Sequence, residues 1–184
     1  MWYARVVDNK PLVALRTIAL KTHSPTIFTL KEFHHLPDYV ATYPDDGMLF
    51  RSSNMQLSAH SDAGYLNEGK ARSRASAHVC LSENVPIPFL NGVVLTIAQI
   101  IKCVMSLAAE AELVSLFITT RKCVELSQTL TEMGWLQNPT PMQVDNTTAV
   151  GVVTNNTTPK QTKSMDIRLW RLRCRTNQKQ FQPH

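Results

Sequence analysis

Three acidic residues stand where the sequence predicts that a strand or a helix begins or ends. Asp62 closes an alternating run of apolar and polar residues, 55–61, whose period of two is typical of a strand. Glu112 lies in the first turns of a long helical pattern, and Asp145 closes a short later strand. Element ends can lie side by side in a fold, so we expect these three carboxylates to converge.

Converged carboxylates would make a site for a hard divalent cation. Carboxylate oxygens are the ligands that Mg²⁺ or Mn²⁺ selects, and two such ions about 4 Å apart can clamp a phosphodiester for in-line attack by water. Without the metal, mutual repulsion would raise at least one carboxyl pKa. The competing interpretation of Asp62 is a plain turn aspartate, because Asp and Gly both favour turns.

A second glutamate competes with Glu112 for a place in this site. Glu110 and Glu112 are two residues apart on the predicted helix and therefore point about 200° apart, so only one can face the site. Periodicity leaves the choice open, since Glu110 lies nearer the apolar face of the helix.

The elements that position these acids follow from the hydrophobic periodicity. Two helices come first and finish near residues 43–44. Three strands with short links follow, which favours an antiparallel meander. Ser106 is the expected N-cap of the long helix and Gly134 its natural stop. The expected elements are helices over 11–21 and 26–39, strands over 55–62, 75–81 and 93–100, a helix over 106–133, a strand over 142–145, and helices from 147 and over 160–175.

Composition places the chain among globular proteins. Of its 184 residues, 43% are hydrophobic and 18% charged, and no apolar run approaches the ~20 residues of a membrane span. The N-terminus lacks the apolar region of a signal peptide, so we expect an intracellular protein, cytoplasmic or nuclear, with no membrane partner. The four cysteines are scattered without a C-x-x-C pair, which argues against structural zinc.

Positive charge gathers near the C-terminus. The net charge is +5, and from residue 160 onward the single acid is Asp166. Such a basic segment favours a polyanionic partner, with nucleic acid first, although a solvated helix face would have the same composition. The basic residues of this segment are Lys160, Lys163, Arg168, Arg171, Arg173, Arg175 and Lys179.

Four motifs occur in order over about 110 residues. Residues 61–63 read S-D-A, 106–113 read S-L-A-A-E-A-E-L, 139–146 read P-T-P-M-Q-V-D-N, and 162–168 read T-K-S-M-D-I-R. Together they resemble the ribonuclease H region of copia-type long-terminal-repeat retrotransposon polyproteins. In that family the motifs read approximately S-D-A, S-S-T/A-E-A-E, P-T-P-I-x-x-D-N and R-T-K-H-I-D-I-R.

The resemblance implies a fold and a division into domains. Residues 51–184 would form an α/β, ribonuclease H-like mixed sheet, three antiparallel strands plus a parallel strand, with flanking helices. Residues 1–50 would be a small helical segment, similar to the family's connection between reverse transcriptase and ribonuclease H. The Y-A-R at 3–5 and the L-P-D-Y-V-A-T-Y-P at 36–44 carry this part of the likeness.

The resemblance also implies site residues and partners. Asp62, Glu112 and Asp145 would be catalytic acids that bind Mg²⁺ or Mn²⁺, and Glu112 is favoured over Glu110 because it directly precedes an apolar residue. The substrate would be the RNA strand of an RNA–DNA hybrid, and the natural partner the remainder of a polyprotein. Asp166 would cap or pair the last helix. The residues expected to contact nucleic acid are Arg72, Arg74, Lys102, Asn146, Lys163, Arg168 and Arg171.

The chain also departs from the family pattern. Gln161 stands where an arginine is usual, and Ser164 replaces a common histidine. Family members continue past residues 181–184 into a strand and an A-D-x-x-T-K helix start that supplies a fourth acid. We therefore expect a domain that lacks its C-terminal strand and helix and cuts a hybrid weakly or not at all.

Two alternatives stay open. The first is an inert retroelement remnant that binds nucleic acid non-specifically. The second is another two-metal nuclease or transferase of the same superfamily, such as an integrase core, which only the motif match disfavours.

Overall fold

A computed structural model describes residues 2–85, 87–89, 91–154 and 166–184 of the chain. The protein divides into two compact units, Met1–Phe50 and Arg51–His184.

The first unit consists of helices α1 (Tyr3–Val6), α2 (Leu12–Lys21) and α3 (Ile27–Thr42). The hydroxyl of Thr26 caps α3 by accepting the Thr29 amide at 3.2 Å, as expected of a threonine at a helix start. Helix α3 continues past Pro37 to Thr42, close to the expected finish of the helical pair near residues 43–44. Proline removes one helical hydrogen bond, but the hydrogen bonds of the turns on either side keep this segment helical.

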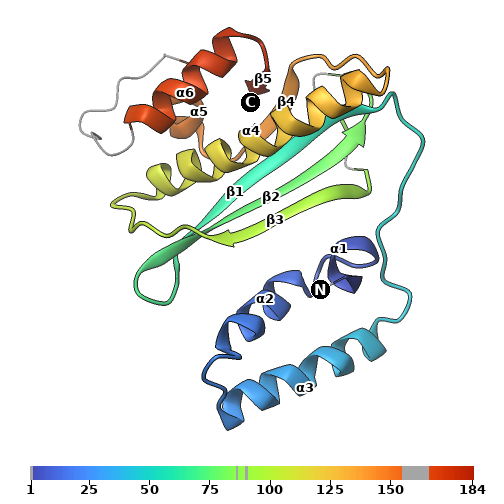
Figure 1. The fold of residues 1–184 in the computed structure, drawn as a ribbon, viewed down its shortest axis with the longest axis vertical. Coiled ribbons are helices and arrows are strands. Elements are labelled where there is room, and N and C mark those ends of the chain that lie inside the picture. The colour runs from blue at the N-terminus through green and yellow to red at the C-terminus, as the bar shows by residue number, and fades with distance from the viewer. Residues whose placement is uncertain (1, 86, 90, 155–165) are drawn as a thin grey trace. The chain divides into compact units, whose positions relative to one another are not determined.

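A five-stranded mixed sheet forms the centre of the second unit (Figure 1). The strand order is β3-β2-β1-β4-β5; β1, β2 and β3 are antiparallel neighbours, whereas β4 is parallel to both β1 and β5. The predicted meander and the α/β fold class are thus confirmed. The strands are β1 (Gln56–Glu68), β2 (Arg72–Ser82), β3 (Val93–Ile100), β4 (Thr140–Val144) and β5 (Phe181–Pro183).

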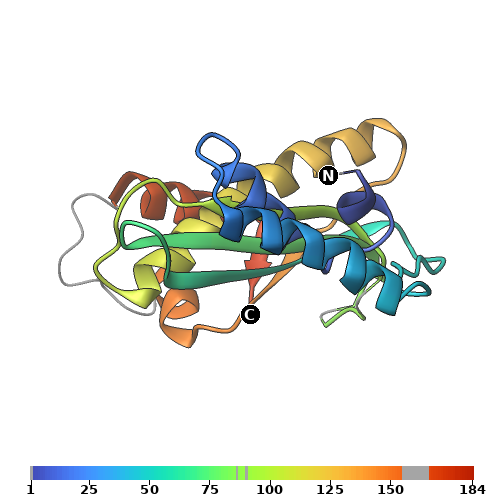
Figure 2. The same ribbon diagram turned by 90° about the horizontal axis from the view of Figure 1, so that it is seen from below.

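Three helices of this unit pack together on one face of the sheet. The long helix α4 (Ala108–Glu132) lies across β1 and β2 and contacts α5 (Thr147–Val153) and α6 (Asp166–Asn177) (Figures 1 and 2). Gly134, at φ +94°, ends α4 where the sequence predicted a stop, because glycine adopts this conformation without strain. Within the described ranges, no helix combines the length and apolar character required to cross a bilayer.

Strand β1 is longer than the sequence predicted. Asp62 was expected at its end, but β1 pairs with β2 through Gly64 and resumes at Glu68, so Asp62 lies within the strand opposite Ser76. The polar residues after Asp62 resemble a loop in composition, yet backbone pairing needs no apolar side chains. The reversal comes at residues 69–71, where Lys70 and Ala71 take positive φ values of 64° and 51°.

The expectation that the last strand is missing does not hold. Phe181–Pro183 form β5, whose Phe181 pairs with Thr140 of β4 and is 2% exposed. Beyond it the His184 carbonyl accepts the Val144 amide at 3.0 Å. A strand of three residues is too short to produce a readable period, and for this reason the sequence did not predict it.

We expect Phe181→Ala to destabilise the protein by about 3 to 5 kcal/mol, because truncating a buried aromatic residue leaves a cavity in the core. Gln182→Ala changes the exposed neighbour on the same strand and should alter stability by about 0.5 kcal/mol or less. Urea denaturation measures both. Equal effects would contradict the placement of β5 in the core.

Candidate metal site

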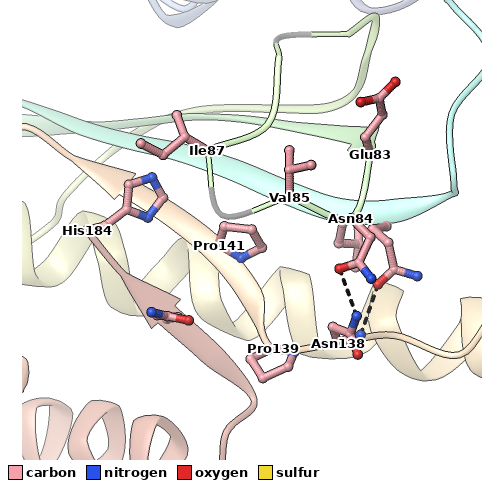
Figure 3. Close-up of a pocket in the computed structure, with 11 residues that line it drawn as sticks. Glu83, Asn84, Val85, Ile87, Asn138, Pro139, Pro141 and His184 are labelled. Atoms are coloured by element: carbon pink, nitrogen blue, oxygen red, sulfur yellow. Dashed lines mark hydrogen bonds between the residues drawn. The ribbon is translucent and has the colours of Figure 1, made fainter.

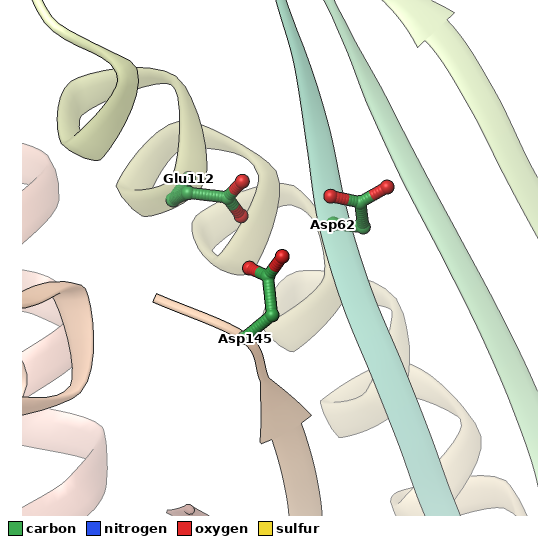
Figure 4. Close-up of side chains that lie close together, drawn as sticks. All are labelled: Asp62, Glu112 and Asp145. Carbon is green, nitrogen blue, oxygen red and sulfur yellow. The ribbon is translucent and has the colours of Figure 1, made fainter. Parts of the chain in front are cut away.

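The structure brings the three predicted acids together (Figure 4). Asp62 comes from β1, Glu112 from the second turn of α4, and Asp145 directly follows β4. One oxygen of each carboxylate lies within 4.8 Å of the others. The parallel pairing of β1 with β4 reaches Ser61 and Val144, so the next residue of each strand is an aspartate where β4 leaves the sheet.

A buried serine fixes α4 against this point of the sheet. Ser115 is 0% exposed, and its hydroxyl lies 2.7 Å from the Asp62 carbonyl oxygen and 3.2 Å from that of Ser76. Ser61 in turn donates to the Ser115 hydroxyl at 3.2 Å. Because Ser115 follows Glu112 by three residues, it lies on the same face of α4. Sequence reasoning missed Ser115; its only signal is a small polar residue on an otherwise apolar helix face.

Glu112 is the buried member of the cluster. Its side chain is 6% exposed, and its Oε1 accepts the Ala63 amide at 3.1 Å. The same amide lies 2.7 Å from Asp62 Oδ1, so one donor orients two carboxylates. Burial, together with the charges of Asp145 and Asp62, raises the pKa of Glu112 to about 7, while the hydrogen bond from the Ala63 amide lowers it.

This environment fits a divalent cation. Glu112 Oε2 is buried and has no hydrogen-bond partner among the described residues, so an acceptor faces the cluster with nothing to bind. Asp62 and Asp145 are exposed, which leaves room for water ligands on the outer side. Oxygen ligands from carboxylates and water are those that Mg²⁺ and Mn²⁺ prefer. The acidic cluster could therefore bind a metal.

Glu110, the second candidate for the site, binds the backbone at the start of α4 instead. Glu110 Oε2 accepts the Ser106 amide at 2.8 Å, so its carboxylate is turned away to satisfy a backbone donor ahead of α4. The helix begins at Ala108 with Leu107 as its N-cap, one residue later than the Ser106 cap predicted. Glu112 is thus the glutamate that faces the cluster.

Two hollows of the second unit differ in chemistry. One of about 290 Å³ adjoins the acids and is lined by Asp62 and Asp145 with His60, His78 and Gln143. Burial lowers the pKa of both His60 and His78, so they are neutral at neutral pH. The other hollow, of about 480 Å³, lies beside β4 and β5 and has one carboxylate, Glu83 (Figure 3). It therefore lacks a cation ligand set.

The residues predicted to contact nucleic acid differ in their exposure. Arg74 is 3% exposed and its Nε donates to Glu68 Oε1 at 2.5 Å, which removes it from the expected phosphate contacts. Arg72 is half-buried at the start of β2, and Lys102 is exposed before α4. A role for these two in nucleic-acid binding stays a prediction.

Three of the remaining predicted contacts lie on or next to α5 and α6. Asn146 caps α5, with its Oδ1 accepting the amides of Thr148 and Ala149 at 3.0 and 3.1 Å. Arg171 is exposed, and Arg168 is half-buried with its Nη1 3.6 Å from Cys103 Sγ. Lys163 and the side chain of Asp166 lie outside the described residues.

The arrangement of strands and helices is similar to that of solved ribonucleases H. No family model and no curated protein matches the chain. A ribonuclease H1 isolated from compost by a metagenomic approach aligns over 71% of this chain and 83% of its own, with TM-score 0.53 and 8% identity. The N-terminal ribonuclease H domain of a Mycobacterium tuberculosis protein aligns over 70% and 78%, with TM-score 0.48 and 14% identity. The fold is ribonuclease H-like.

The raised pKa of Glu112 predicts a pH-dependent stability of the metal-free protein. The folded state holds the proton up to about pH 7, whereas an unfolded glutamate releases it near 4.5. Stability is therefore fullest below pH 4.5 and falls as pH rises to 7, by about 2 kcal/mol after allowance for solvent screening.

Urea denaturation in EDTA across this range measures the effect. Glu112→Gln has no carboxyl to titrate at this position and should not lose this stability. The free energy of unfolding of Glu112→Gln relative to the wild type should therefore rise between pH 4.5 and pH 7. Glu132→Gln, an exposed change near the end of α4, is the matched control. Parallel pH profiles for the wild type and Glu112→Gln would contradict the burial of this carboxyl.

We expect Ser115→Ala to cost about 1 to 2 kcal/mol of stability and to weaken Mg²⁺ binding, because the hydroxyl that holds α4 to β1 is lost. Ser127→Ala, farther along α4, should affect neither. Calorimetric titration with Mg²⁺ measures the binding. Unchanged Mg²⁺ affinity in Ser115→Ala would show that the hydrogen bonds of Ser115 do not position Glu112.

Proposed function

We propose that the Arg51–His184 unit binds Mg²⁺ or Mn²⁺ through Asp62, Glu112 and Asp145 and hydrolyses the RNA strand of an RNA–DNA hybrid. The observation that carries this proposal is the convergence of these carboxylates, from β1, α4 and the end of β4, within 4.8 Å on a ribonuclease H-like sheet. The fold alone would not support it, because one fold hosts many activities.

The residues of the chain would prepare the site in three ways. Asp62 and Asp145 present charged oxygens toward solvent, where a phosphodiester can approach. Glu112 supplies the inner ligand and gives up its proton when a cation binds, while the Ala63 amide keeps it beside Asp62. A bound divalent cation supplies Lewis-acid stabilisation of phosphoryl oxygens and lowers the pKa of bound water.

The origin that we propose is a copia-type retrotransposon polyprotein. Its support is the order and wording of the four motifs, two of which contain Asp62 and Asp145 and a third Glu112. On this proposal the Met1–Phe50 unit is the helical connection that follows a reverse transcriptase, and the partners are nucleic acid and the remainder of the polyprotein. The alternative is an inert remnant that binds nucleic acid without cutting it.

The test is cleavage of an end-labelled RNA strand by the purified chain, in a DNA hybrid and in an RNA duplex, with Mg²⁺ or with EDTA. We expect weak Mg²⁺-dependent cutting of the hybrid, because the site described has three acids and no fourth. Asp62→Asn should reduce this cutting about a hundredfold or more, since a metal ligand is lost. Asp45→Asn, an exposed change in the first unit, should retain activity. Binding without any cleavage would favour the inert remnant, and cleavage that survives Asp62→Asn would refute the assigned site.

A further inference from the structure

Helices α4 and α6 contact each other (Figure 1), and three arginines on these helices lie close enough for their charges to interact. Arg121 comes from α4, and Arg171 and Arg175 come from one face of α6, four residues apart. Burial lowers the pKa of Arg175, and the neighbouring charges of Arg171 and Arg121 add to the effect. We name these three residues the arginine seam.

The arginine seam contains a hydrogen-bond donor that has no acceptor among the described residues. Nη1 of Arg175 is buried without a hydrogen-bond partner in the part of the chain that the structure describes. None of the ion pairs among the described residues includes a seam arginine. Glu125 lies close enough to favour the charged form of Arg175, but its carboxylate accepts from Lys122 at 2.7 Å.

Such an arrangement is unfavourable until an anion binds. A buried donor without a partner and three like charges both lower the stability of the free protein. Phosphate would relieve both, because it accepts several hydrogen bonds and guanidinium matches its geometry. We propose that the arginine seam binds a backbone phosphate of nucleic acid.

The surroundings favour nucleic acid over free phosphate. Residues 167–184 contain no acid, so the positive surface continues along α6. Trp170, next to Arg171, is 69% exposed even though Leu169 and Leu172 already bury the helix against the core. An exposed aromatic ring on a basic helix is a platform on which an unpaired base of a single-stranded nucleic acid can stack.

The seam is a contact separate from the acid site. Arg121 follows Glu112 by nine residues, which is about 14 Å along the axis of α4. A strand of duplex advances about 3.4 Å per nucleotide, so the two points are about four nucleotides apart along that axis. Only the choice of hybrid as the ligand rests on the proposed function; phosphate binding at the seam does not.

The first test compares salt dependence in two double variants of the full chain. Anisotropy of a labelled hybrid and of a labelled single strand is measured in EDTA, so that no cleavage occurs. R171Q/R175Q should weaken binding about tenfold and make the slope of log affinity against log salt shallower by about one to two. R5Q/K31Q removes the same charge from exposed sites of the first unit and should leave the slope unchanged. Equal slopes in the two double variants would overturn the proposal.

The second test uses stability and identifies the anion. Arg175→Gln should raise the melting temperature of the free protein, because a guanidinium whose buried Nη1 has no partner among the described residues is removed. A raised melting temperature also rules out loss of folding. Inorganic phosphate should raise the melting temperature of the wild type more than that of Arg175→Gln. If phosphate stabilises the wild type but R171Q/R175Q leaves the slope of log affinity against log salt unchanged, nucleic acid is refuted as the ligand.

These measurements separate the seam from the enzyme. A shallower slope in R171Q/R175Q with no hydrolysis by the wild type would refute the proposed function and leave the seam standing. Hydrolysis that needs Asp62, with an unaltered slope in R171Q/R175Q, would refute the seam alone.

Discussion

The structure depends on holding a buried glutamate beside two aspartates. Three carboxylates repel one another, so their approach requires a rigid frame, and the frame here is the contact of α4 with β1. Ser115 binds the backbone of β1 and β2, and the Ala63 amide serves both Asp62 and Glu112. Without a cation, Glu112 keeps a pKa raised by burial and by the charges of the two aspartates, and its Oε2 has no hydrogen-bond partner among the described residues.

The position of β1 in the sheet explains why the acids meet there. It is the strand between the antiparallel pair β2 and β3 and the parallel pair β4 and β5. Where β4 stops, at Val144, the sheet opens next to Asp62 and the start of α4 reaches across. A parallel neighbour that ends early thus gives space for ligands from three elements, which a continuous sheet would fill with backbone pairing.

The sequence predicted the meander, the long helix and its stop at Gly134, because each has a long period or a residue with one strong preference. It also predicted the convergence of the three acids, from their expected places at the ends of elements, although Asp62 in fact lies within β1. The choice between Glu110 and Glu112 depended on where α4 begins, and periodicity does not fix helix starts to one residue. The role of Ser115 was not predictable, because it depends on a contact between segments that are distant in the sequence. Strand β5 was not predictable because it has only three residues.

Locating Mn²⁺ by anomalous scattering in crystals of the protein tests directly whether these three carboxylates form one cation site. We expect an anomalous peak about 2.0 to 2.3 Å from a carboxylate oxygen of each of Asp62, Glu112 and Asp145. The peak should be lost in crystals of Glu112→Gln. Mn²⁺ bound elsewhere, with the three acids free of metal at saturating concentration, would show that they do not form a cation site.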